Sequence, residues 1–117
     1  MPSDERLAVH AELKLLFSLT KMAYSHFMSN GKTYLYASRL LEYNTRLREA
    51  LYENAALFSQ PVQQHIAKLV FHIDVWKTCF EEYYRDTQPT NSSVFDFPND
   101  VNYPRDAEEA ILEACSG

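Results

Sequence analysis

The hydrophobic and polar positions of this chain fall into three long segments with a helical period, over 3–30, 32–58 and 60–86. Asn30-Gly31 follows the first segment, Pro61 opens the third, and a Pro/Asn/Ser-rich stretch follows residue 86. Long helices joined by tight turns must pack side by side in opposite directions, so this spacing predicts an all-α antiparallel helical bundle. A weaker pattern over 104–116 predicts a short fourth helix, and we expect residues 1–117 to form one domain.

The most regular pattern lies in 60–86. Its apolar residues recur at steps of three and four: Val62, Ile66, Leu69, Ile73, Trp76, Phe80 and Tyr83. Such a seam is typical of a core-facing helix, and we expect Trp76 to be buried at its centre. A second stripe lies on the opposite side of the same helix: Phe71, Val75 and Cys79. This stripe predicts a further covering element, either the C-terminal segment or a second subunit.

The segment 3–30, with Ser3 as its expected N-cap, is apolar over more than half of its circumference. Its polar positions share a narrow arc: His10, Lys14, Ser18, Lys21 and Ser25. A helix with so much apolar surface needs partners on more than one side. It is therefore either the central helix of the bundle or the contact with a second copy, and a homodimer is expected.

The segment 32–58 carries a clear apolar stripe: Ala37, Leu40, Leu47, Leu51 and Phe58. Asn44 and Asn54 interrupt it, and an amide on a buried face must find hydrogen-bond partners. Glu42 and Arg46 stand four residues apart on the polar side, which predicts an ion pair.

Residues 87–103 combine turn formers with apolar anchors: Val94, Phe95, Phe97 and Tyr103. Aromatic rings are costly to leave in water, so we expect an ordered loop that packs across the bundle end or along the Phe71 stripe. The helix over 104–116 has only a thin stripe and is expected to be the least stable element: Ala107, Ala110, Ile111 and Ala114.

The net charge of −5 is unevenly placed. Basic and acidic residues balance over 1–86, whereas the remainder of the chain holds one basic residue, Arg105, and six acidic ones: Asp96, Asp100, Asp106, Glu108, Glu109 and Glu113. We interpret these six as a candidate surface for a partner protein with a basic face. The alternative is a solvated helix whose carboxylates contact no partner.

Few residues indicate catalysis or cofactor chemistry. The four histidines lack the spacing of a helical metal site, and the two glycines form no phosphate-binding loop. Arg6 and His10 approach the Arg-His motif of HEPN-type helical ribonucleases, but their spacing is one residue too short. Cys79 lies on an apolar stripe, where an inert thiol is expected. We therefore expect no metal, no cofactor and no enzymatic activity.

Arg39 and Arg46, with tyrosines nearby, form the basic patch that would suit nucleic acid. Interleaved glutamates and the acidic balance of the chain speak against such binding, so this patch is our second choice of partner surface.

The chain has no run of about 18 apolar residues and its two cysteines fit a reducing compartment, so we expect a soluble cytoplasmic protein. The favoured function is a non-enzymatic protein-protein interaction module: a small adaptor, accessory subunit or inhibitor. The alternatives are a compact helical nuclease or nucleic-acid-binding subunit, and a phage-type inhibitor whose acidic face occupies a nucleic-acid site.

Overall fold

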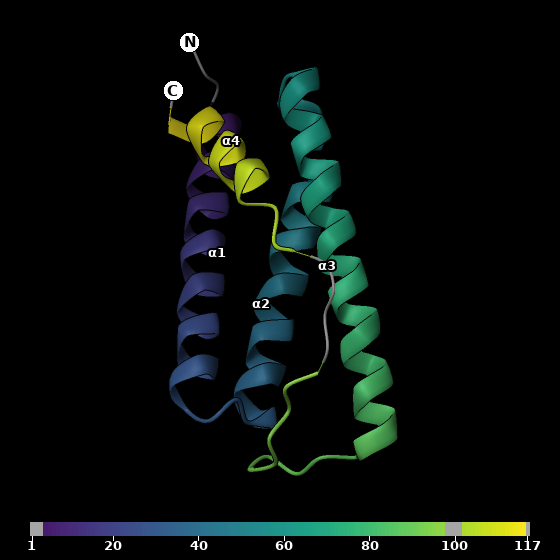
Figure 1. Ribbon diagram of the computed structural model, residues 1–117. Helices are drawn as coiled ribbons and strands as arrows, with labels where there is room; N and C mark the ends of the chain where they lie inside the picture. Colours follow the sequence, from purple (N-terminus) through teal and green to yellow (C-terminus); the bar gives the residue numbers. More distant parts are fainter. Residues whose placement is uncertain (1–3, 98–101, 117) are drawn as a thin grey trace.

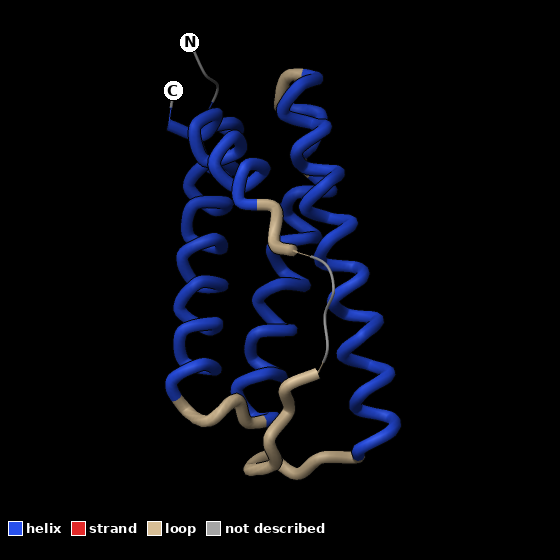
Figure 2. The backbone as a smooth tube through the Cα atoms, viewed as in Figure 1, coloured by secondary structure: helices blue, strands red, loops and turns tan. Residues whose placement is uncertain are grey.

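The structure is a computed structural model that describes residues 4–97 and 102–116. Its helices are α1 (Asp4–Ser29), α2 (Tyr34–Glu53), α3 (Gln60–Thr87) and α4 (Arg105–Ser116), with a 3-10 turn at Ala55–Leu57. The first three run up and down beside one another, and α4 crosses the upper end (Figure 1). The described residues form no strand (Figure 2). The all-α antiparallel bundle is therefore confirmed.

The core has two parts along the long axis of the bundle. In the upper part all four helices contribute fully buried side chains, among them Leu13, Leu51, Leu69 and Ile111. The lower part is aromatic and centres on Phe95, which belongs to the loop and is also fully buried. Within the described ranges, no helix is long and apolar enough to span a membrane.

Backbone carbonyls of the loop after α3 cap the first turn of α2. The N-cap residue, Thr33, makes no side-chain cap. Instead the Tyr34 N–H donates to the Ser93 carbonyl at 2.9 Å, and the Leu35 N–H donates to the Asn91 carbonyl at 3.1 Å. These carbonyls satisfy donors that a helix start otherwise leaves open. As a result α2 begins at Tyr34, two residues later than the sequence suggested.

The other end of α2 also differs from the expectation of a helix to residue 58. The helix ends at Glu53, where the Asn54 amide donates to the Ala50 carbonyl at 2.8 Å. Asn54 thus terminates the helix rather than lying within it, and Asn44 is half-buried. The following 3-10 turn still brings Phe58 into the core, at 7% exposure.

One further expectation needs correction, and one alternative is decided. Trp76 is half-buried rather than central, and it contacts Phe80 and Phe97 in the lower aromatic cluster. Phe71 is 66% exposed, so the loop does not follow its stripe. The aromatic loop packs across the bundle end, which was the other expected position.

The fourth helix is better anchored than its thin stripe suggested. Ala107, Ile111 and Cys115 face the upper core, and Cys115 extends the stripe by one turn. Glu108 is buried beside them. Because α4 contacts both α1 and α3, it bridges these two helices at the upper end of the bundle.

Candidate interaction surfaces

Three of the six acidic residues proposed as a partner surface bind lysines of the bundle. Asp96 pairs with Lys32 at 3.2 Å, Asp106 with Lys68 at 2.7 Å, and Glu108 with Lys21 at 3.1 Å. The hydrogen bond from Lys68 lowers the pKa of the Asp106 carboxyl. Lys21 and Lys68 belong to α1 and α3, and Lys32 lies in the turn between α1 and α2. Each pair thus links the C-terminal part of the chain to a residue far away in the sequence, so these carboxylates also hold that part in place.

The remaining acidic residues are placed differently. Glu109 and Glu113 are exposed one turn apart on α4, and neither has an ion pair within the described residues. Asp100 lies outside the described residues. The structure therefore brings together Glu109 and Glu113 as the open part of the acidic segment, and it buries Glu108.

The second-choice residues, Arg39 and Arg46, are both exposed on α2. Arg46 forms the expected ion pair with Glu42 at 2.8 Å, and its guanidinium lies 5.7 Å from the centre of the Tyr43 ring. Glutamates share this face: Glu42, Glu49 and Glu53. The face carries mixed charge and lacks the concentrated positive potential that phosphate backbones require.

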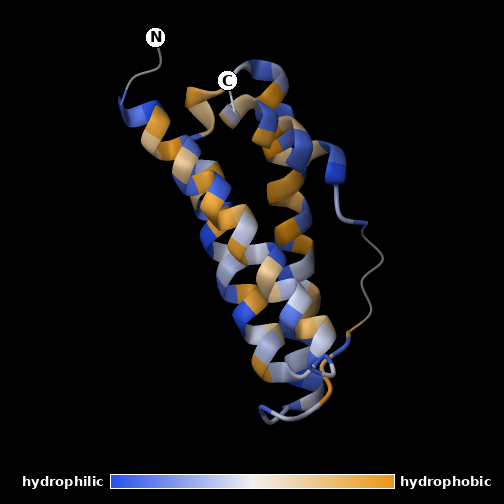
Figure 3. Ribbon diagram, turned by 90° about the vertical axis from the view of Figure 1, so that its left-hand side faces the viewer, coloured by the Kyte–Doolittle hydropathy of each residue, from blue (hydrophilic) through white to orange (hydrophobic). Residues whose placement is uncertain are grey.

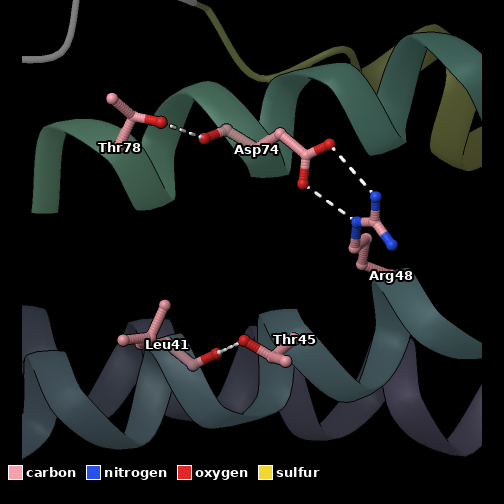
Figure 4. A network of polar contacts seen from close by, with 5 residues as sticks. All are labelled: Leu41, Thr45, Arg48, Asp74 and Thr78. Carbon is pink, nitrogen blue, oxygen red and sulfur yellow. Dashed lines mark hydrogen bonds and ion pairs between the residues drawn. The ribbon is translucent and has the colours of Figure 1, made fainter. Parts of the chain in front are cut away.

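Arg48 has a structural role that the sequence did not indicate. Its guanidinium donates two hydrogen bonds to Asp74, at 2.9 Å and 3.3 Å, across the groove between α2 and α3 (Figure 4). It also lies 5.4 Å from the centre of the Tyr52 ring. The hydrogen bond and the charge of Asp74 raise the pKa of Arg48. This pair ties the two helices together instead of presenting a free cation.

Helix α1 leaves one apolar face uncovered. Leu7, Leu15 and Met22 are 52%, 59% and 55% exposed. Smaller exposed residues stand between them at steps of three and four. We call this set the open face of α1: Leu7, Ala11, Leu15, Ser18, Met22 and Ser25. Figure 3 views the molecule from the α1 side and shows hydrophobic bands along this helix. No other helix of the described chain has three large apolar side chains exposed in one row.

Two of the four histidines are buried. His10, expected on a polar arc, faces the core with its ring 5.6 Å from that of Phe58. Burial, followed by the charges of Arg6 and Lys14, lowers the pKa of His10. Burial also lowers the pKa of His72, whose Nδ1 has no hydrogen-bond partner. Across the described residues, no three His, Cys, Asp or Glu side chains gather closely enough to hold a metal ion.

The cysteines are free thiols at different depths. Cys115 is buried against the core, and burial raises its pKa, although the charge of Lys14 acts in the opposite direction. Cys79 is half-buried on α3. A thiol with a raised pKa is a poor nucleophile at neutral pH, so Cys115 serves as packing.

A shallow hollow of ≈ 440 Å³ opens at the lower end of the bundle. It is lined by Tyr34 of α2 and by Phe80, Glu81, Tyr84 and Arg85 of α3. The rings of Tyr34 and Tyr84 are 5.5 Å apart and contact each other, so they leave no slot between them for a third ring.

Comparisons with protein-family models, with curated proteins and with solved structures gave no match.

Proposed function

We propose that this protein is a non-enzymatic protein-protein interaction module, and that the open face of α1 is its contact surface. The observation that carries the proposal is the row of Leu7, Leu15 and Met22, each more than half exposed on a helix whose other face is in the core. Contiguous exposed apolar side chains are a mark of protein contacts, whereas single ones are ordinary. The two free thiols support a reducing compartment such as the cytoplasm.

The occupant that this face fits best is a second copy of the chain. Large and small residues alternate along the open face. An antiparallel pairing about a two-fold axis sets Leu15 opposite Ser18 of the second copy and Met22 opposite Ala11, and it brings Leu7 to within one residue of the position opposite Ser25. Every large side chain then meets a small one, as a self-complementary interface requires. A parallel pairing in register would oppose large with large and small with small.

The size of the face sets the strength of the dimer. From Leu7 to Ser25 the helix rises about 27 Å and is about 10 Å wide, a projected area of roughly 270 Å². Stable complexes bury about 800 Å² on each partner. We therefore expect reversible dimerisation in the micromolar range or weaker.

The charged residues at the edge of the open face of α1 determine how salt affects dimerisation. Lys14 and Lys21 border one edge of the open face, and equivalent edges meet in an antiparallel two-fold pair. Lys21 is already paired with Glu108, so the repulsion that salt screens is mainly that between the Lys14 side chains of the two copies. Dimerisation should therefore persist or strengthen when salt is added, whereas docking of an acidic surface on a basic partner weakens.

A concentration series followed by light scattering tests this proposal. The wild-type mass should rise from 13.6 kDa towards twice that value. Leu15→Glu should stay at the monomer mass, because it places two charges in the contact. Phe71→Glu, a matched change at a site that is 66% exposed on α3, should dimerise normally. A wild type that stays monomeric at millimolar concentration would overturn the proposal.

A second candidate surface is the pair Glu109 and Glu113, with a basic partner protein. The observation in its favour is that both carboxylates are exposed and have no ion pair within the described residues. Binding of a lysine-rich peptide at low salt should fall in a Glu109→Gln/Glu113→Gln variant. A Glu49→Gln/Glu53→Gln variant removes the same charge from α2 and serves as the control. If both variants bind alike, this candidate is wrong.

A further inference from the structure

The segment that leads into α4 lies over His72 of α3. The Tyr103 ring meets the His72 ring edge-on, with 5.4 Å between the ring centres and an angle of 89°. His72 is only 9% exposed, and its Nδ1 has no hydrogen-bond partner. A buried polar atom without a partner costs free energy, and it costs more when the group becomes charged.

Tyr103 is itself held by a short chain of polar contacts. Its hydroxyl donates to Glu108 Oε1 at 2.8 Å, and Glu108 Oε2 lies 3.1 Å from Lys21 Nζ on α1. Burial and this hydrogen bond raise the pKa of Tyr103 far above its usual range, so the phenol stays protonated. Each oxygen of Glu108 therefore has one partner, and these two contacts hold the Tyr103 hydroxyl between α4 and α1.

Burial is the cause of the lowered pKa of His72, and the charged groups on the neighbouring elements are paired with one another. On α3, Lys68 lies one turn before His72 and is paired with Asp106 of α4. On α1, the charged residue that belongs to this chain of contacts is Lys21, which is paired with Glu108. Arg48 of α2 pairs with Asp74 of α3. Asp74 comes two residues after His72, so it lies on the opposite side of α3 from His72.

We propose that His72 and Tyr103 form an acid-sensitive latch, and that protonation of His72 releases residues 102–116 from the bundle. A charged His72 needs water at Nδ1, which has no hydrogen-bond partner in the closed form. Entry of water beside this ring would separate Tyr103 from α3, because the two rings are in edge-on contact. Release then uncovers Ala107, Ile111 and Cys115, which line the upper core. This device is independent of the open face of α1.

The direction of the pH effect follows from linkage. The pKa of His72 is lowered from 6.5 in the closed form, so the open form binds more protons at acid pH. Above pH 6.5 His72 does not favour the open form, and the latch weakens as the pH falls from 6.5 towards the lowered pKa. Each pH unit in this interval increases the ratio of open to closed forms by up to about tenfold.

The reactivity of Cys115 reports the opening. In a Cys79→Ser background, Cys115 is the single thiol, and it is buried when the latch is closed. The probe is 4,4′-dithiodipyridine, which reacts in acid, and each rate is divided by that of N-acetylcysteine at the same pH. This normalised rate should rise several-fold between pH 7 and pH 5, while far-UV circular dichroism shows that the long helices persist.

Three variants separate the latch from general acid unfolding. His72→Phe keeps a ring under Tyr103 but has no titrating group, so the normalised labelling rate of Cys115 should not change between pH 7 and pH 5. If this variant does not fold, His72→Leu takes its place. His10→Phe removes the other buried histidine and should keep the rise. Tyr103→Phe loses the hydrogen bond to Glu108, so Cys115 should be labelled faster than in the parent protein already at pH 7. An equal rise in the His72 variants, or opening only together with loss of all helix, would overturn the proposal.

Discussion

The loop residue Phe95 should contribute as much stability as a core residue of a helix. Its side chain is fully buried, and its ring centre lies 4.8 Å from that of Phe80, 5.0 Å from Tyr83 and 5.2 Å from Tyr34. A buried aromatic removes about 150–250 Å² from water. At about 25 cal/mol per Å² this amounts to roughly 4–6 kcal/mol, of which alanine retains a part. We expect Phe95→Ala to lower the free energy of unfolding by about 3–5 kcal/mol.

Urea unfolding of the wild type and the variant measures this loss. A domain of this size has a stability of about 6–18 kcal/mol, so the midpoint should fall strongly. Phe71→Ala removes the same side chain from a site that is 66% exposed, and it should change stability by less than about 0.5 kcal/mol. If Phe95→Ala cost less than about 1 kcal/mol, the loop would not be part of the core, and the reasoning about the lower cluster would fail.

Two further changes test how the C-terminal helix and the α2–α3 groove are held. Ile111→Ala should destabilise by about 2–5 kcal/mol in thermal or urea unfolding, because Ile111 is fully buried; a loss near zero would mean that α4 is not packed on the core. A double-mutant cycle on Arg48 and Asp74 should give a coupling below about 1 kcal/mol that shrinks with salt, because both side chains are partly exposed; a coupling of several kcal/mol would contradict this solvated geometry.

The sequence predicted the architecture because breakers and a helical period are local signals. The seam from Ile66 to Phe80 identified the buried side of α3. The aromatic loop could be predicted to pack, since exposed rings are costly. Its final position could not be predicted, because the carbonyls of Asn91 and Ser93 cap a helix more than 50 residues earlier in the chain, and no local pattern encodes such a contact.

The surfaces were harder to predict than the core. A cluster of acidic residues indicates a charged surface, but the sequence did not show that Glu108 would be buried between Lys21 and Tyr103. The pairing of His72 with Tyr103 depends on where the last helix docks, and this is a tertiary property. By contrast, the sequence predicted the excess apolar surface of α1, because apolar residues cover more than half of the circumference of this helix. Leu15 and Met22 are exposed in the fold.

The distance between two spin labels at Ser29 tests most directly whether α1 pairs with a second copy. Ser29 is exposed at the end of α1, and Ser29→Cys in a Cys79→Ser/Cys115→Ala background gives one labelling site per chain. The proposed antiparallel register separates the two sites by about 38 Å along the helix axis at 1.5 Å per residue. A pulsed electron resonance measurement should therefore give a distance near 40 Å, on the order set by that rise and the helix spacing. A short distance, or none at millimolar protein, would contradict the proposed dimer.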